Sequence, residues 1–270
     1  LNEEAVRVAS FSLSLALCDF LDPRSIWNEL SFPKLVNENL IVSDFFDNDL
    51  DSRLTKYDIV IGNPPWQSQL TNKANNYLKE NKYIVGDKQI AQAFPIKCAS
   101  ICKETGVVCL LMPSKGLLFN RSPKSRAYRR RFFDENTVSV IINFSIYRKV
   151  LFDNATAPCT AIIYYPKKID GNNTTIFYCT PKPQYSLQDT KKFSIDPTDI
   201  CRIPSDLVCD DRIWKIAMWG SPRDLGLIDR LQSTYPSLDQ FLLNHNMKSA
   251  EGFKRGNRKL IYDGFANLPI

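Results

Sequence analysis

Hydrophobic residues recur at a helical spacing near the start of the chain and gather into short continuous runs further along. In residues 3–19, apolar side chains at Ala5, Val8, Ala9 and Ala16 fall on one face, which predicts an amphipathic helix. The runs typical of strands lie at residues 40–45, 57–62, 107–112, 138–144, 159–165 and 174–179. Continuous apolar strands that alternate with helical stretches predict an α/β fold, with a parallel sheet covered on both faces.

Further helices are expected at residues 88–104, at 224–232 and after Ser237. Pro95 lies inside the first of them and predicts a kink or a later helix start. Gly106 is placed to end that helix.

Composition is that of a globular protein. With 270 residues, 44% of them hydrophobic, the chain is long enough to bury a sizeable core in one or two domains. No apolar stretch reaches membrane-spanning length and no signal-peptide pattern is present, so we expect a soluble, cytoplasmic protein.

The cysteine and histidine content narrows the possible chemistry. The 8 cysteines are scattered, and the closest pair, Cys98 and Cys102, is expected on one helical face without zinc-type spacing. We therefore expect reduced core thiols. The single histidine, His245, argues against a histidine-based metal site or a Ser-His-Asp triad. No metal is expected, and most hydrolase classes are excluded.

The tetrad Asn63-Pro64-Pro65-Trp66 directly follows the apolar run 57–62. Two consecutive prolines make this turn stiff, because each fixes its own φ and Pro65 also restricts Pro64. The Asn63 side-chain oxygen and the Pro64 carbonyl can then accept hydrogen bonds from one NH2 group, while Trp66 stacks on the attached ring. An aryl amine is a weak nucleophile, so alignment and acceptor hydrogen bonds are the expected catalytic contributions.

Basic residues are concentrated in one part of the chain. The net charge is +6, and no acidic residue occurs between Glu104 and Asp134. We expect Lys115, Arg121 and Lys124, on a loop after a strand, to contact nucleic-acid phosphates. The run Arg129–Arg131 fits either the same basic patch or a solvated helix face.

The tetrad resembles motif IV of the amino-methyltransferases. The surrounding chain resembles the N6-adenine DNA methyltransferases of restriction-modification systems, with the gamma-class motif order of type I and type IIG enzymes. Residues 39–46 look like motif III, which implies that Asp44 and Phe45 bind the adenine of S-adenosylmethionine. Residues 107–113 look like motifs V and VI. Residues 149–153, before 158–165, look like motif VIII, which nominates Phe152 to stack on the target base opposite Trp66, although an ordinary core aromatic is as plausible there.

One family motif is missing. The resembled enzymes bind their cofactor with a Gly-rich turn upstream of motif II, and residues 1–9 are similar to the segment just after that motif. We therefore expect a Rossmann-like methyltransferase fold that is incomplete at its N-terminus. By this reasoning the 270 residues alone neither fold stably nor bind S-adenosylmethionine, and are inactive.

The resemblance also implies a domain organisation. Residues 1–180 are expected to form the catalytic core without its first strands, and 181–245 a connection with two helices. Residues 246–270 are expected to begin a target-recognition domain, since 250–259 are rich in Gly, Lys and Arg. A flexible basic tail is the alternative for this last segment.

Together these features predict a site-specific DNA adenine-N6 methyltransferase of a restriction-modification or phage-defence system. Its cofactor would be S-adenosylmethionine, and its partners double-stranded DNA and restriction or specificity subunits or domains. Two alternatives remain at this stage. One is a non-catalytic DNA-binding subunit of such a system, and the other is an amino-methyltransferase that acts on cytosine N4, RNA or protein glutamine.

Overall fold

The computed structural model describes residues 2–51, 55–152, 157–168, 175–182, 195–220 and 222–248. The chain separates into two compact units, Leu1–Met218 and Trp219–Ile270. In the described part of the chain, no helix combines the length and the hydrophobicity needed to cross a membrane. The predicted target-recognition segment at 250–259 lies outside the described residues.

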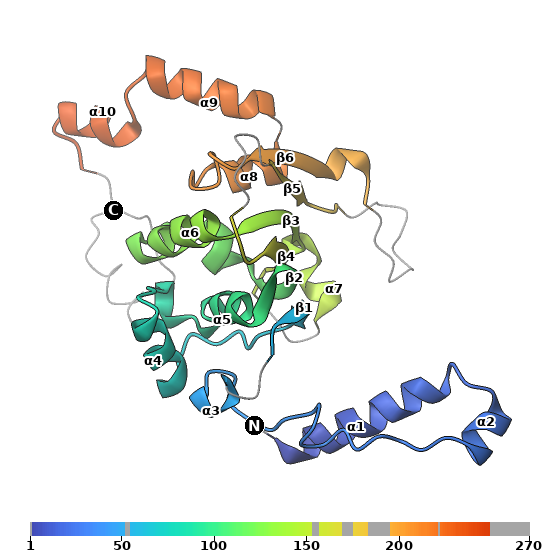
Figure 1. Cartoon of the computed structure of the whole chain (residues 1–270). Coiled ribbons are helices and arrows are strands. Elements are labelled where there is room, and N and C mark those ends of the chain that lie inside the picture. Colours follow the sequence, from blue (N-terminus) through green and yellow to red (C-terminus); the bar gives the residue numbers. More distant parts are fainter. Residues whose placement is uncertain are drawn as a thin grey trace, which may run out of the picture. The chain divides into compact units, whose positions relative to one another are not determined.

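A six-stranded sheet forms the centre of the first unit (Figure 1). Its strands are β1 (Tyr57–Gly62), β2 (Cys102–Pro113), β3 (Thr137–Asn143), β4 (Cys159–Tyr165), β5 (Thr175–Cys179) and β6 (Ile200–Pro204). They are arranged in the order β1-β2-β4-β3-β5-β6.

The sheet is mixed, which confirms the α/β class but not the parallel arrangement. Strands β1 and β2 run parallel, as do β3 and β5, whereas β4 is antiparallel to both of its neighbours and β6 is antiparallel to β5. The prediction of a parallel sheet was wrong because apolar runs report burial and carry no information on strand direction.

Helices cover one face of this sheet. The helices of the first unit are α1 (Glu3–Cys18), α2 (Pro23–Asn28), α3 (Asn48–Asp51), α4 (Asn72–Glu80), α5 (Phe94–Ile101), α6 (Pro123–Glu135), α7 (Arg148–Leu151) and α8, whose bounds are Ile213–Trp219. Tyr164 of β4 donates a hydrogen bond to the Pro95 carbonyl of α5 at 2.6 Å, and its ring meets Phe132 of α6 edge-on at 5.1 Å. Tyr178 of β5 packs edge-on against Trp214 of α8 at 5.3 Å. These fully buried aromatic side chains tie the helices to the sheet.

The opposite face of the sheet is open among the described residues. Along β2 the buried side chains alternate with half-buried ones, and on β1 the side chains of Ile59 and Ile61 are 62% and 77% exposed. Coverage on both faces was therefore a wrong prediction for this part of the chain.

The segment before β1 is helical as predicted, but its predicted strand is absent. Helix α1 begins after Asn2, whose side-chain oxygen accepts a hydrogen bond from the Glu4 amide at 2.9 Å. Residues 40–45 do not form a strand in the described structure, where only an isolated bridge joins Val36 to Leu40. A strand needs a paired neighbour, and this apolar run has none here.

The predicted helix at 88–104 is broken into shorter elements. Single 3₁₀ turns occur at Gly86–Lys88 and Ile90–Gln92, and α5 begins only at Phe94 with Pro95 in its first turn. This later start agrees with the effect expected of the proline. Gly106 lies inside β2 and does not end a helix, and Cys102 starts that strand, so the expected shared helical face with Cys98 was wrong.

Further elements lie beyond residue 180, where the core was predicted to end. Strand β6 extends the sheet, and a 3₁₀ turn at Pro197–Asp199 precedes it. The second unit contains α9 (Pro222–Thr234) and α10 (Leu238–Asn244), the two predicted helices, and the Ser237 side chain caps the latter. The division of roles at residues 180 and 245 stays a prediction.

Replacement of Gly106 by alanine is expected to destabilise the sheet. A Cβ atom at this position would lie 2.7 Å from the Asp58 carbonyl oxygen and 2.9 Å from that of Tyr57, so the backbone of β1 must shift. We expect a loss of about 1–3 kcal/mol in the free energy of unfolding, measured by urea titration with circular dichroism. Gly226→Ala is the control, because nothing lies within 4 Å of its added Cβ and alanine favours the helix. Equal stability of both variants would contradict this packing.

Candidate active site

The Asn63–Trp66 turn lies at the carboxyl edge of the sheet. Gly62, the last residue of β1, pairs with Leu110 of the parallel strand β2, so the turn projects beside the end of β2. The Trp66 indole Nε1 donates a hydrogen bond to the Leu111 carbonyl at 3.4 Å. Pro64 is buried while Asn63 is exposed. The turn is thus held by the sheet at both ends and leaves the Asn63 amide free to meet a ligand.

Phe152 lies directly beside Trp66. Their ring centroids are 5.1 Å apart, and the ring planes meet at 73°, an edge-on contact. Both side chains are partly exposed. The sequence motifs nominated these two aromatics for the same base, and the structure brings them together across 86 positions of the chain. A base inserted between two parallel rings needs them to be about 7 Å apart, which is twice the stacking distance in DNA. The edge-on contact leaves no such gap.

Small polar side chains lie at the same edge of the sheet. The Ser114 amide donates to the Pro158 carbonyl at 2.8 Å, and the Ser145 hydroxyl donates to the Ser114 hydroxyl at 3.4 Å. Asn143, at the end of β3, accepts from the Ser145 amide at 3.0 Å. These residues were not found from the sequence, where single serines carry no signal. They connect the segments that follow β2 and β3 to the segment that precedes β4.

Asp44 and Phe45 occupy a turn, not the end of a strand. The Asp44 Oδ1 atom accepts a hydrogen bond from the Phe46 amide at 2.9 Å, an Asx turn that fixes the carboxylate. Among the described residues, its Oδ2 atom has no hydrogen-bond partner. The Phe45 ring stacks on Phe94, the first residue of α5, at 5.1 Å. A flat aromatic ring therefore stands next to an available carboxylate oxygen, which can accept a hydrogen bond from an exocyclic amine.

The three predicted phosphate contacts are exposed side chains near one another in the chain, but two lie on helical turns. Lys115 begins a π-helical turn, Lys115–Phe119, and its ammonium lies 3.9 Å from the Asp87 carboxylate. Arg121 lies in the loop, and Lys124 is in the first turn of α6. The prediction that all three lie on a loop was therefore wrong for Lys115 and Lys124.

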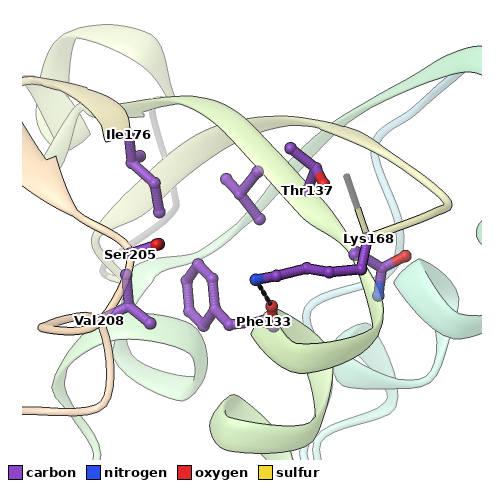
Figure 2. Close-up of a pocket in the computed structure, with 8 residues that line it drawn as sticks. Phe133, Thr137, Lys168, Ile176, Ser205 and Val208 are labelled. Carbon is purple, nitrogen blue, oxygen red and sulfur yellow. Dashed lines mark hydrogen bonds between the residues drawn. The ribbon is translucent and has the colours of Figure 1, made fainter. Parts of the chain in front are cut away.

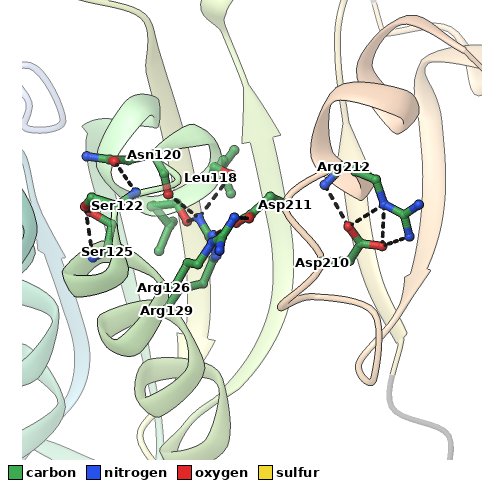
Figure 3. A network of polar contacts seen from close by, with 10 residues as sticks. Leu118, Asn120, Ser122, Ser125, Arg126, Arg129, Asp210, Asp211 and Arg212 are labelled. Atoms are coloured by element: carbon green, nitrogen blue, oxygen red, sulfur yellow. Dashed lines mark hydrogen bonds and ion pairs between the residues drawn. The ribbon is translucent and has the colours of Figure 1, made fainter. Parts of the chain in front are cut away.

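Arg129 belongs to the core and not to a basic surface (Figure 3). Its side chain is 1% exposed, and its Nη1 donates to the carbonyls of Leu117 at 3.3 Å, Leu118 at 3.2 Å and Asn120 at 3.4 Å. Its Nη2 pairs with the Asp211 carboxylate. Both readings of this residue as a surface cation were wrong, because it satisfies the carbonyls that end the π-helical turn.

A small cavity lies at the other end of the sheet strands and is too small for an organic ligand (Figure 2). Its volume is about 10 Å³, which is room for roughly one water molecule. Phe133, Val138 and Ile176 form its apolar wall, and the Lys168 ammonium donates to the Phe133 carbonyl at 2.8 Å. This cavity is a packing defect at the edge of the core.

The thiols form no disulfide, and the buried thiol of Cys98 is inert. All 8 cysteines are free, and burial together with neighbouring Cys102 raises the pKa of Cys98 to about 12. A thiol with so high a pKa stays protonated at neutral pH and is a poor nucleophile. The polar and aromatic residues around the Asn63–Trp66 turn, and not the cysteines, therefore form the candidate active site.

Comparison with known families identifies the chain. A sequence profile described as the Eco57I restriction-modification methylase matches residues 1–151, more than half of the chain. The chain belongs to this family. By its description this is a family of restriction-modification methylases, and the matched Eco57I-family segment contains both the Asn63–Trp66 turn and the Asp44 turn. No curated protein matches the chain in sequence.

Several solved structures resemble this Eco57I-family chain in fold. They include the methyltransferase subunit of a type I restriction-modification system from Streptococcus thermophilus, with 18% identity, a TM-score of 0.41 and coverage of 65% of this chain and 35% of that one. The M protein of the type I restriction enzyme EcoKI has 15% identity, a TM-score of 0.40 and coverage of 55% and 32%. The type IIG restriction endonuclease BpuSI has 15% identity, a TM-score of 0.44 and coverage of 66% and 22%. The chain thus spans about a third of the two type I subunits, and less of BpuSI.

Loss of the Asp211 charge is expected to destabilise the fold and loosen the turn at 117–120. In Asp211→Asn the Arg129 guanidinium stays buried without its counter-ion, so we expect a loss of about 3–5 kcal/mol in the free energy of unfolding. Asp210→Asn is the matched control. Its side chain pairs with that of Arg212, and both are partly exposed, so about 1 kcal/mol or less should be lost. Similar urea midpoints for the two variants would show that Arg129 does not depend on Asp211.

Proposed function

We propose that this chain is the catalytic part of a site-specific DNA methyltransferase that modifies the N6 amine of adenine in a restriction-modification or phage-defence system. The observation that carries the proposal is the Asn63–Trp66 turn, which is fixed at the carboxyl end of β1 with Phe152 5.1 Å from Trp66. Family membership supports the methyltransferase part of the proposal. We also propose the cytoplasm as its location.

The chemistry follows from the acceptors of the turn. Asn63 presents its side-chain oxygen, and Pro64 its carbonyl, to the two hydrogens of one exocyclic amine. Such a grip orients the amine lone pair and stabilises the positive charge that develops on nitrogen when it attacks. Pro65 keeps the turn stiff, because its ring restricts the preceding residue.

The target adenine has to leave the duplex, since its amine is not accessible to a buried site while the base is stacked. Trp66 and Phe152 would stack on the extruded base and offset part of the cost of unstacking. Their present edge-on contact closes this space. We therefore propose that Phe152, which directly follows α7, moves away from Trp66 when the base enters.

The proposed cofactor, S-adenosylmethionine, supplies an electrophilic methyl group when it is bound. Asp44 would accept a hydrogen bond from its adenine amine through Oδ2, and Phe45, backed by Phe94, would form the flat wall beside it. DNA is the proposed macromolecular partner, with Lys115, Arg121 and Lys124 as phosphate contacts. Restriction or specificity subunits or domains are the proposed protein partners.

Asn63→Ala is expected to lower methyl transfer to DNA on the order of a hundredfold or more, because one of two acceptors for the amine is lost. The affinity for S-adenosylmethionine should be unchanged, because Asn63 is not among the residues proposed to bind it. Transfer of a radiolabelled methyl group to DNA by the intact protein is the measurement. Asn28→Ala, an exposed asparagine in α2, is the control and should keep full activity. Full turnover in Asn63→Ala would remove Asn63 from the reaction.

Charge reversal of the proposed phosphate contacts is expected to weaken DNA binding. In Lys115→Glu/Arg121→Glu, the dependence of log affinity on log salt should become shallower by about 2, since each lost phosphate contact accounts for about 0.9. Lys34→Glu/Lys215→Glu, at exposed lysines outside the site, is the control. An unchanged slope in the first variant would show that this segment does not touch the DNA.

A further inference from the structure

A groove of about 510 Å³ opens beside the candidate active site. It is lined by residues of α4, the following segment 81–88 and the first turn of α6. Its first lining residue, Gln69, follows Trp66 by three positions, and three residues of chain span at most about 10 Å. The volume is in the range of sites that hold small organic ligands. The groove thus lies next to the place proposed for the target base.

Positive charge dominates the polar part of this groove. Lys79, Lys88 and Lys124 line it, and no Asp or Glu is among its described lining residues. Within the described part of the chain, none of these three ammonium groups pairs with a carboxylate. The adjacent carboxylate of Asp87 interacts with other groups. It accepts a hydrogen bond from the Asn120 side chain at 2.8 Å and lies 3.9 Å from the Lys115 ammonium. Three lysine ammonium groups without a carboxylate partner favour an anionic ligand.

The rest of the groove is apolar or amide in character. Leu78 and Val85 are buried in its floor, and Ile84 is 56% exposed at its rim. Asn72 and Asn75 add side-chain amides that donate and accept hydrogen bonds. A ligand that combines an anionic group with a sugar or a flat ring matches all three kinds of surface.

The wall of the groove is fixed before any ligand arrives. The Arg131 guanidinium lies 3.7 Å from the centre of the Tyr83 ring and donates to the Lys82 carbonyl at 2.6 Å. The Tyr83 hydroxyl donates to the Glu135 carboxylate, so the segment after α4 is tied to α6. Lys82 and Lys88 have φ values of 56° and 52°, a left-handed conformation that costs about 1–2 kcal/mol for residues other than glycine. Contacts with α6 hold this unfavourable backbone in place.

We propose that this groove binds a nucleotide phosphate and its sugar, provided by the DNA strand next to the target base. This inference rests on the proposed function, because it places a DNA strand at the Asn63–Trp66 turn. Extrusion rotates the target nucleotide about its backbone, and cations that contact the neighbouring phosphates fix the position of that backbone. The short distance between groove and turn favours this occupant over an acidic peptide of a partner protein.

The test compares two double variants of the intact protein in binding a labelled DNA duplex, measured by fluorescence anisotropy between 50 and 200 mM salt. Lys79→Gln/Lys88→Gln removes two groove charges, and Lys34→Gln/Lys215→Gln removes two exposed charges elsewhere. We expect the groove variant to bind on the order of tenfold more weakly, with a salt slope shallower by about 2. The control should match the unmodified protein. Equal slopes for the two variants would overturn the proposal.

Titration of the same proteins with a mononucleotide and with inorganic phosphate separates the sources of the anion. If these bind in a lysine-dependent way while the DNA slope is unchanged, the groove holds a free phosphate compound and the DNA assignment is wrong. If only an acidic peptide binds, a protein partner is the occupant and the proposal is likewise wrong. Lysine-dependent DNA binding without any methylated product would keep the groove assignment and reject the proposed function. If DNA is methylated but the groove variant has an unchanged salt slope, the proposed function is kept and the groove assignment is rejected.

Discussion

The parallel pairing of β1 with β2 is the interaction on which the candidate site depends. Ile61 pairs with Cys109 and Gly62 with Leu110, and this register places the Asn63–Trp66 turn beside the end of β2. The hydrogen bond from Trp66 to Leu111 continues the contact past the last paired residue. β1 is an edge strand whose outward side chains are largely exposed, so its position depends on this single neighbour within the described sheet. A shift of one residue would turn the other face of the strand, and with it the turn, away from the site.

A second constraint holds the segment that carries the proposed phosphate contacts. The buried Arg129 guanidinium donates hydrogen bonds to three carbonyls of the turn at 117–120, and the Asp211 carboxylate neutralises its charge. Burial lowers the pKa of Arg129, and the Asp211 charge opposes that shift. The backbone of the segment that carries the exposed cations Lys115, Arg121 and Lys124 is therefore fixed by these hydrogen bonds from Arg129. The same helix, α6, also holds the wall of the groove lined by Lys79, Lys88 and Lys124, through the contact between Arg131 and Tyr83.

Local features were predictable from the sequence and long-range ones were not. The apolar runs of β1 and β4 are bounded by turn residues, and their predicted limits agree with the structure. Helix α4 was missed because it is mostly polar, although Thr71 as N-cap before the buried pair Ala74 and Leu78 is a recognisable signal. The strand expected at 40–45 fails for a different reason, since a strand depends on a neighbour that a local pattern does not specify.

The site shows the same division. The Asn63–Trp66 motif could be predicted from the sequence because its functional groups are on adjacent residues. The burial of Arg129 could not, because it depends on Asp211, 82 positions away. We propose that this chain serves to methylate adenine N6 in DNA. The most direct measurement is mass spectrometry of the nucleosides released from DNA after incubation of the intact protein with S-adenosylmethionine. We expect N6-methyldeoxyadenosine. N4-methyldeoxycytidine, or methylation of RNA or protein with none in DNA, would contradict it.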